Sequence, residues 1–465
     1  MKETCLRTLV LIVLGTGLAG CASLLPPTKV EVSVAPAWHT PLPHGGTVGA
    51  LSAWWQQQGD PVLVELIAAA QDASPSVAQA LARIAAARAN QATARAALLP
   101  NVNAQLGATR ANLQPDTPAA TTQSLGLQAA WELDLVGANQ AVSDAARAQV
   151  ESSQAQWHDA RVSIAAEVAN LYYGLSTCRQ LLDVAREDAQ SRRETARLSE
   201  LSAKAGFAAP AVAALARASA ADSNSRLTQQ TAQCALDTKA LVALTALSQP
   251  DLEEKLAIAL VNKAQLAPLF VASVPAQAIS QRPDVFVAER DVVVASAQVG
   301  SAIAQRLPRL SLSGSIGAMR VTTGAAQVSG ATWSLGPLTL SLPVFDAGQR
   351  AAAVTSAEAA YQGAVVAYQG KVRLAVREVE EALVNLQSTD ARRLDADIAT
   401  QGYTESLAAT QTRYSQGLAS LVELEDARRF ALAAQTAQLT LKLERNRAWV
   451  SLYRALGGGW DASRI

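Results

Sequence analysis

Histidine, methionine and aromatic residues are scarce in this chain. Its 465 residues include three His, two Met and four Cys, and only 4% are aromatic. His39, His44 and His158 have no spacing that suggests a shared ligand. No Ser/His/Asp constellation, CxxC pair or phosphate-binding loop stands out. The sequence therefore predicts a protein that is not an enzyme, with no catalytic residues, no cofactor and no metal site.

Charge of either sign is also low. Charged residues make up 17% of the chain, against about 25% in typical proteins, and the 39 basic and 39 acidic residues cancel. A nucleic-acid partner is not expected from such a balance. Half of the residues are hydrophobic, and much of that half is alanine. This composition excludes a disordered chain and favours long, closely packed helices.

The N-terminus has the pattern of a bacterial signal peptide over residues 1–20. Lys2 and Arg7 precede a short apolar segment, Leu9–Leu14, and Leu18-Ala19-Gly20-Cys21 resembles the lipobox of bacterial lipoproteins. That resemblance implies lipidation of Cys21, and because no Asp follows the cysteine it favours the outer membrane. An ordinary secretory signal with a chance cysteine is the alternative. Beyond it, no stretch reaches the 18 apolar residues of a membrane helix.

Matching landmarks recur about 210 residues apart. Pro75 and Pro100 are repeated by Pro283 and Pro308, and Gly206 is repeated by Gly417, 211 residues later. A fixed long period indicates an internal repeat. We therefore expect a duplicated chain with these parts: signal peptide 1–20, N-terminal arm 21–60, first repeat 61–248, linker or equatorial region 249–282, second repeat 283–456 and C-terminal tail 457–465.

Each repeat has the same predicted order of elements. A helix, two strands, a very long helix and a return helix follow one another, at 75–99, 101–113, 121–135, 138–205 and 210–247, and again at 283–307, 309–320, 332–345, 349–416 and 418–456. The strands alternate apolar and polar residues, as in Leu125, Leu127 and Ala129, although the fourth changes phase near Gly336-Pro337. This alternation fits a membrane β-barrel, and a half-buried sheet outside the membrane is the alternative.

Four strands cannot close a barrel, so the chain is expected to oligomerise. Two copies would supply eight strands and three would supply twelve, and an eight-stranded interior is filled by side chains. A conducting pore therefore needs at least a trimer. The long helices, each about 100 Å by helical rise, carry apolar residues at coiled-coil spacing. Together these features predict a mainly α protein with a membrane β-barrel portion and a helical tunnel beneath it.

Two cysteines lie symmetrically about the first hairpin turn. Cys178 precedes Gly206 by 28 residues and Cys234 follows it by 28, so they would sit level on facing helices. An oxidising periplasm favours a disulfide between them, and two buried free thiols are the alternative.

Acidic residues follow the second turn. Glu423 and Asp426 are three residues apart and share one helix face. In a trimer they would form rings of like charge at the tunnel end, which favour cations. A solvated helix face with arginine pairs is the alternative.

The chain resembles the TolC-like outer-membrane factors, specifically the lipoprotein branch that serves RND-type efflux pumps. The resemblance runs from Trp54 to Trp460 and is carried in order by these segments: Leu99-Pro100, Trp131-Glu-Leu-Asp-Leu-Val-Gly137, Gln281-Arg-Pro-Asp-Val285 with Ala288-Glu289, and Ala455-Leu-Gly-Gly-Gly-Trp460. Any one of these segments is weakly specific, whereas together on a duplicated frame they are highly specific.

This resemblance implies a homotrimer with a twelve-stranded outer-membrane barrel, a long trimeric α-barrel and an equatorial belt. It implies passive conduction of drugs or other small toxic compounds, with a periplasmic adaptor (membrane-fusion protein) and an inner-membrane RND-type transporter as partners. The hairpin turns at Gly206 and Gly417 would contact the adaptor. Glu423, Asp426 and Tyr414 would form the periplasmic aperture, or gate.

The sequence departs from this family at two places and leaves one rival open. Ala419 and Val212 stand where some relatives have an Arg and an Asp that lock the closed tip. The lock must therefore be built from other groups. A lipid-anchored periplasmic coiled-coil adaptor is the rival function, although it would not explain two pairs of alternating strands.

Overall fold

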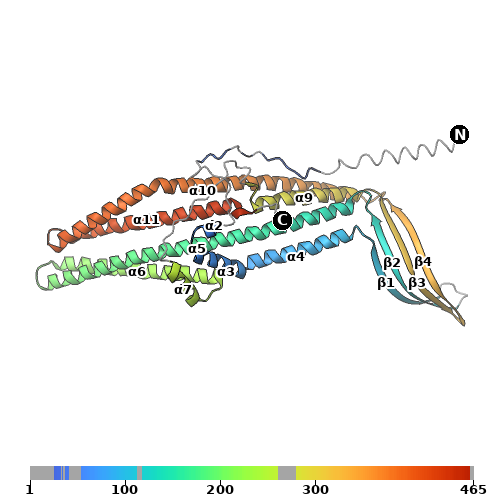
Figure 1. Ribbon diagram of the computed structural model, residues 1–465, viewed down its shortest axis with the longest axis horizontal. Helices are drawn as coiled ribbons and strands as arrows, with labels where there is room; N and C mark the ends of the chain where they lie inside the picture. The colour runs from blue at the N-terminus through green and yellow to red at the C-terminus, as the bar shows by residue number, and fades with distance from the viewer. Residues whose placement is uncertain are drawn as a thin grey trace. The chain divides into compact units, whose positions relative to one another are not determined.

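The computed structural model describes residues 26–32, 34, 37–40, 54–112, 118–259 and 279–460. Over these residues the chain is mainly helical with one antiparallel sheet (Figure 1). The elements are α2 (Trp54–Gln57), α3 (Pro61–Ala73), α4 (Pro75–Ala96), β1 (Asn101–Ala111), β2 (Ala120–Leu133), α5 (Ala138–Lys204), α6 (Pro210–Thr245), α7 (Gln249–Ala259), α9 (Pro283–Ala304), β3 (Arg309–Thr323), β4 (Ala326–Ser341), α10 (Gln349–Ser415), α11 (Leu421–Ala455) and a short 3₁₀ turn, η3 (Gly457–Gly459).

The predicted elements are present, with differences at their ends and four additions, which are α2, α3, α7 and η3. Both long helices have 67 residues, and α4 and α9 both have 22. Helix α3 precedes α4, with Asp60 as its N-cap, and α7 lies in the segment expected to be a linker. Strands β3 and β4 extend further than predicted, because a two-residue turn after Thr323, with Gly324 at φ +57°, joins them directly.

The chain divides into two compact units, and each draws on both halves of the sequence. Unit 1 comprises 1–32, 81–155 and 286–371, and unit 2 comprises 33–80, 156–285 and 372–465. Matching elements of the two halves pack together, as β2 pairs with β3 in unit 1. The tertiary units therefore do not follow the predicted sequence segments, whose boundaries remain a prediction.

Unit 1 contains the sheet, whose strand order is β1-β2-β3-β4 with every pair antiparallel. Its register places apolar residues of the four strands side by side. One such row is Ala104, Leu127, Ile316 and Trp333. A small helical core in the same unit comprises Val292, Ala295, Val299 and Tyr361.

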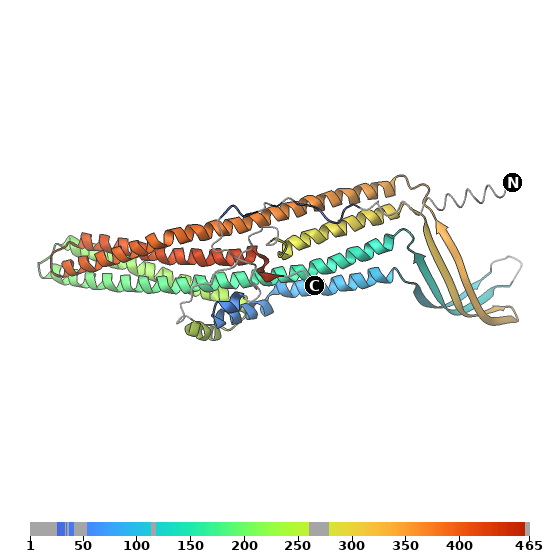
Figure 2. The ribbon, with the colours of Figure 1, turned by 45° about the horizontal axis from the view of Figure 1, so that its top comes forward.

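Unit 2 contains the main hydrophobic core. Trp54 stacks on Tyr453 with ring centroids 5.1 Å apart, and leucines of α3, α5, α6, α7, α10 and α11 pack into the same cluster. In two views α5 runs beside α6, α10 runs beside α11, and both hairpins turn at the same end of this unit (Figures 1 and 2). Among the described helices, none contains a segment apolar enough to cross a membrane.

Candidate functional site

The sheet of unit 1 has one continuous apolar face. Because side chains alternate along strands, the observed register places these residues on it: Val102, Ala104, Leu106, Leu125, Leu127, Ala129, Trp131, Leu133, Leu310, Leu312, Ile316, Ala318, Ala331, Trp333, Leu335, Leu338 and Leu340. Most of the large side chains in this set are exposed in the single chain, and Trp333 is 79% exposed. An exposed apolar surface of this kind marks a contact with a membrane or another protein.

A bulge keeps the fourth strand in phase with this face. Leu312 pairs with Leu338, but Gly314 pairs with Leu335, so β4 has one more residue than β3 in this interval. The extra residue lies at Gly336-Pro337, where the peptide bond is cis. The phase change in the sequence is therefore cancelled by the bulge, and the leucines on both sides of it share one face.

The opposite face of the sheet is polar. It carries Asn103, Gln105, Gln128, Ser311 and Ser315, and the Ser315 and Ser334 hydroxyls lie 2.8 Å apart. In the part of the chain that the structure describes, β1 and β4 each pair with one strand only. Both edges of the sheet therefore present backbone groups that can pair with another chain.

Sequence motifs hold the strands to the helices. The Trp131 indole donates a hydrogen bond to the carbonyl of Leu98 at 3.1 Å, which ties β2 to the end of α4. Asp346 accepts from the backbone N–H groups of Gly348 and Arg350 at the start of α10, and these bonds lower the pKa of its carboxyl group. Asp134 accepts likewise from Gln140 at the start of α5. These motif residues are thus structural.

In unit 2, the motif at 281–285 contacts the motif at the end of α11. The buried Arg282 guanidinium binds both Asp284 oxygens at 2.9 and 2.8 Å, Glu378 at 2.7 Å and the carbonyl of Ala455 at 2.9 Å. Gly457 has φ +79°, and a Cβ built on it would lie 2.2 Å from the carbonyl oxygen of Gln281. Only glycine fits at position 457. The motif at 281–285 therefore packs directly against the glycines at 457–459, and we call this contact the joint.

Both hairpin turns end their long helix in the same way. Phe207 N–H bonds the carbonyl of Ser202 while Gly206 N–H bonds that of Ala203, and Leu418 and Gly417 bond Arg413 and Tyr414 identically. This is the Schellman motif, in which the glycine adopts a left-handed conformation; φ is +80° at Gly206 and +75° at Gly417. Phe207, directly after the first turn, is 88% exposed.

Of the predicted aperture residues, Glu423 and Asp426 lie at the start of α11 and Tyr414 lies at the end of α10, and each has a partner within the chain. Glu423 forms a capping box with Ser420 and lies 3.6 Å from Arg413, and these bonds lower the pKa of its carboxyl group. Asp426 pairs with Arg429 at 2.9 Å on an exposed face. Tyr414 packs on a small cluster formed by Ala196, Ala216, Leu421 and Leu424.

A buried group of charges near these residues was not expected from the sequence. Arg192 of α5 and Arg428 of α11 are both buried, and both bind Glu425. The prediction singled out Glu423 and Asp426, whereas the residue between them that turns inward is Glu425. Helical periodicity offered a signal, because Glu425 follows the buried Leu421 by four residues and precedes the buried Arg428 by three.

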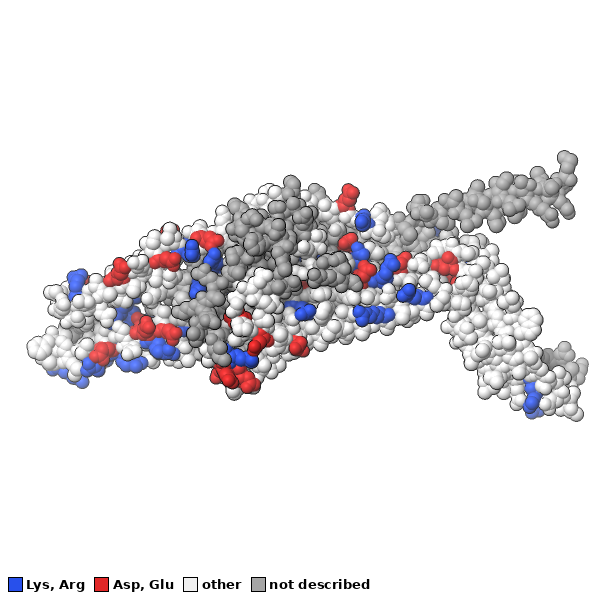
Figure 3. Space-filling model, in the orientation of Figure 1, with Lys and Arg blue, Asp and Glu red and all other residues white. Residues whose placement is uncertain are grey.

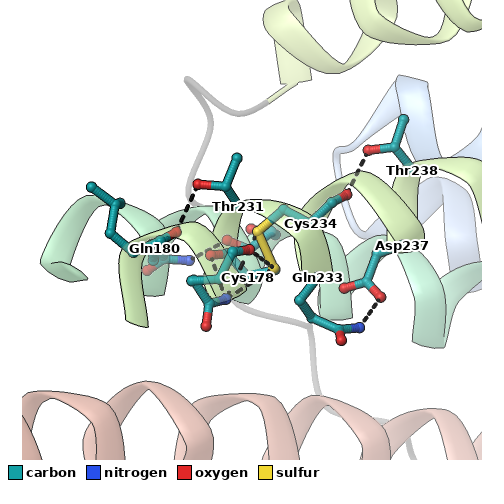
Figure 4. The surroundings of a disulfide bond; sticks show 10 residues. Cys178, Gln180, Thr231, Gln233, Cys234, Asp237 and Thr238 are labelled. Atoms are coloured by element: carbon teal, nitrogen blue, oxygen red, sulfur yellow. Dashed lines mark hydrogen bonds between the residues drawn. A yellow bond between two sulfur atoms is a disulfide. The ribbon is translucent and has the colours of Figure 1, made fainter. Parts of the chain in front are cut away.

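Cys178 and Cys234 form a disulfide that joins α5 to α6, with their Cα atoms 5.6 Å apart (Figure 4). Beside it, Thr238 donates to the carbonyl of Cys234 at 2.9 Å and Gln230 donates to the sulfur of Cys178 at 3.1 Å. The other predicted modification, lipidation of Cys21, lies outside the described residues.

Charged side chains gather over the helices and are sparse over the strands, as one face of the molecule shows (Figure 3). Among the residues that the structure describes, no three His, Cys, Asp or Glu side chains are grouped so that they could hold a metal ion. Large exposed apolar side chains of the described residues lie on the sheet face and beside the hairpin turns.

Comparisons with known proteins show the family of the chain. The family model described as "Outer membrane efflux protein" matches residues 66–247 and 274–458. The chain is 31% identical to outer membrane protein OprJ of Pseudomonas aeruginosa over 87% of this chain and 86% of that protein. It is 29% identical to the toluene efflux pump outer membrane protein TtgI of Pseudomonas putida over the full length of both.

A solved structure of an outer-membrane channel has a similar fold. The outer-membrane channel OprN superposes with a TM-score of 0.78 at 25% identity, covering 94% of this chain and 99% of that one.

Proposed function

The chain belongs to the outer membrane efflux protein family, and from this premise we propose that it is the outer-membrane channel of a tripartite efflux pump. Similar proteins are named as outer membrane components of efflux pumps, which supports an efflux function for this chain. The proposal extends to its assembly, its membrane anchor and its partners.

The assembly that fits best is a homotrimer with a twelve-stranded barrel. The observation that carries it is the four-stranded sheet, which has an apolar face, a polar face and two edges that lack a second partner among the described strands. A bilayer accepts strands only when every backbone group is bonded, so the sheet must close with copies of itself. Three copies give twelve strands and an interior wider than side chains can fill.

The helices would continue the barrel as a periplasmic tunnel made by a duplicated chain. The two 67-residue helices are each about 100 Å long by helical rise. The elements α4-β1-β2-α5-α6 recur in the order α9-β3-β4-α10-α11, which supports duplication. Residues 249–282 and the C-terminal tail would contribute to an equatorial belt.

The hairpin turns at Gly206 and Gly417 would meet the periplasmic adaptor, which in turn joins an inner-membrane RND-type transporter. Exposed apolar side chains beside the turns support this contact, since Phe207, Leu418 and Val422 are open to solvent in the chain. Acylation of Cys21 would add a lipid anchor in the outer membrane. The channel would conduct drugs or other small toxic compounds passively.

Glu423, Asp426 and Tyr414 are proposed to form the closed aperture at this end. In a threefold assembly the two carboxylates would form rings of like charge, although each has an arginine partner in the single chain. Replacing both carboxylates is expected to increase conductance or antibiotic leakage.

Electron microscopy of the detergent-extracted full-length protein tests this proposal. A threefold cylinder longer than about 100 Å, a length set by helical rise, is the expected result. A thin monomeric rod that stays soluble without its lipid would overturn it and favour the lipid-anchored periplasmic adaptor.

A further inference from the structure

The apolar face of the sheet occupies one interval of the strands. On β3 this interval extends from Leu310 to Ala318, and on β2 the paired interval extends from Leu133 to Leu125. Each interval is nine residues long, and a strand that crosses a membrane needs about 9–11 residues. In the proposed barrel, the residues just beyond it, toward the β1–β2 and β3–β4 connections, therefore lie at the surface of the membrane.

Polar residues replace the apolar ones directly beyond this interval. Because side chains alternate along a strand, every second residue continues the same face. Arg320 is on this face and pairs with Gln123. Arg110 pairs with Thr121 two residues further along and is on the same face. We name this group the loop-end patch, and its members are Arg110, Thr121, Gln123, Arg320, Thr322 and Ser329.

The loop-end patch carries positive charge without a carboxylate beside it in the strands. Arg110 and Arg320 are both exposed, and neither has a hydrogen bond or an ion pair with a described residue. Glu132 is the one acidic residue of the four strands, and it lies at the opposite end of β2 on the polar face. Figure 3 shows basic side chains near the end of the strands that is farthest from the helices.

The two ends of the apolar face differ in charge. At the helix end its last residues are neutral, namely Leu133, Leu310 and Leu340, so its arginines are confined to the loop end. The helices are periplasmic in the proposed channel, which places the loop end at the outer leaflet. Basic residues at a membrane surface attract anionic lipid headgroups, and the glycolipid of the outer leaflet carries phosphate groups.

The spacing of the two arginines suits a headgroup with two phosphates. One strand, β2, separates Arg110 from Arg320, so the two residues lie roughly 10 Å apart across the sheet and about 7 Å apart along it. Each guanidinium can donate two parallel hydrogen bonds to a phosphate. Arginine also lays its methylene groups on apolar surface while its charged end stays in water, which suits a position at the edge of the apolar face.

We propose that the loop-end patch binds a phosphorylated glycolipid of the outer leaflet, with its phosphates on Arg110 and Arg320 and its acyl chains on the adjoining apolar rows. This rests on the proposed channel function, because it requires the apolar face to lie against lipid. Charge complementarity and the adjoining apolar surface together favour a lipid over a free anion, which would use the arginines alone. In a threefold assembly the patch occurs three times around the barrel.

Three variants separate the charge of the patch from its shape. Arg110→Gln with Arg320→Gln removes both charges and keeps long polar side chains. Arg110→Lys with Arg320→Lys keeps the charges and removes the planar fork that binds phosphate. Arg309→Gln is the matched control, because Arg309 is an exposed arginine of the same strand β3 that lies at the helix end on the polar face.

Native mass spectrometry of the full-length protein in detergent measures the binding. The probes are diphosphorylated lipid A, the same lipid without its phosphates, and inorganic phosphate as a competitor. Each basic residue near an anionic lipid surface contributes about fivefold in affinity, so the double Gln variant is expected to bind diphosphorylated lipid A about thirtyfold more weakly. The double Lys variant should lie in between, and Arg309→Gln should equal the wild type. Excess inorganic phosphate should not displace the lipid.

Four results would each overturn the patch. They are equal affinity in the wild type and the double Gln variant, equal loss in Arg309→Gln, equal binding of the dephosphorylated lipid by the wild type, and displacement of the lipid by inorganic phosphate. The comparison of the two lipids uses the wild type alone, so it decides the question even if a variant fails to assemble.

Bilayer conductance of the same preparation separates the patch from the channel function. Protein that conducts but has no preference for the phosphorylated lipid would overturn the patch and leave the channel function intact. Protein that binds no lipid and enters no bilayer would overturn both.

Discussion

The guanidinium of Arg282 donates a hydrogen bond to the backbone carbonyl of Ala455 at 2.9 Å, across 173 residues of sequence. Arg282 is 5% exposed, and its pKa is raised because its bonds to Asp284 and Glu378 outweigh its burial, which acts in the opposite direction. The start of α9 and the end of α11 are fixed to each other by this joint. Two of the segments that carry the family resemblance therefore have a structural role.

Arg282→Lys is expected to destabilise the protein by about 1–3 kcal/mol, because lysine keeps the charge but not the planar fork that binds Asp284, Glu378 and Ala455 together. The thermal unfolding midpoint in detergent measures this. Arg197→Lys, at an exposed pair on α5, is the control and should change stability by less than about 0.5 kcal/mol. Equal midpoints for the two variants would contradict the structural role of the joint.

The two faces of the sheet should respond differently to charge. Ile316→Lys places a charge on the apolar face, where a lysine costs roughly 2–4 kcal/mol in the middle of a membrane. Ser315→Lys, one residue away, points to the polar face and should be tolerated. The amount of assembled protein in the outer-membrane fraction is the measurement, and equal loss in both variants would mean that the sheet faces are misassigned.

The disulfide should stabilise the α5–α6 hairpin. Cys178 and Cys234 are 56 residues apart, and the loop-entropy model gives about 4 kcal/mol for closing such a loop. Replacing both with serine should lower the thermal midpoint. Alkylation of the denatured wild type before and after reduction should differ by two added groups, and no difference would mean that these thiols are free in the protein.

The aperture proposal needs variants that separate charge from capping. Glu423→Gln with Asp426→Asn removes both carboxylates, while glutamine still suits the capping box of α11. We expect this double variant to raise single-channel conductance if rings of like charge restrict the aperture. Ser420→Ala removes the cap and keeps both charges. A conductance increase in Ser420→Ala alone would assign the effect to fraying of α11.

A change at the second turn tests its geometry. Gly417 has φ +75° with open space around its Cα, so Gly417→Ala meets no atom but adopts a disfavoured backbone conformation at a cost of about 1–2 kcal/mol. Gly363→Ala, in the middle of α10 with the same open space, should be neutral or stabilising. Thermal midpoints of the two variants that shift in the same direction would contradict this explanation of the turn.

The periodic parts of the fold could be predicted from sequence. The long helices, the turns and the cysteine pairing follow from 3.6-residue periodicity, turn glycines and equal spacing about Gly206. Helix α3 was missed as a separate element because Pro61 and Pro75 each begin a helix and only the second has a counterpart in the other half.

The facing of β4 and the buried ion pairs of Glu425 with Arg192 and Arg428 could not be predicted, because both depend on register between distant segments. The β4 sequence changes phase, and only the pairing of Gly314 with Leu335 shows that a bulge restores it. Glu425 differs from Glu423 because Arg192 of α5 binds it, and the sequence of α11 alone does not contain that information.

The most direct test of the channel function is the ionic current through the purified full-length protein in a planar lipid bilayer. The account predicts discrete, long-lived conductance steps that require assembled protein and disappear after thermal denaturation. Protein that assembles in the bilayer and carries no current, both as the wild type and as the Glu423→Gln, Asp426→Asn double variant, would contradict it.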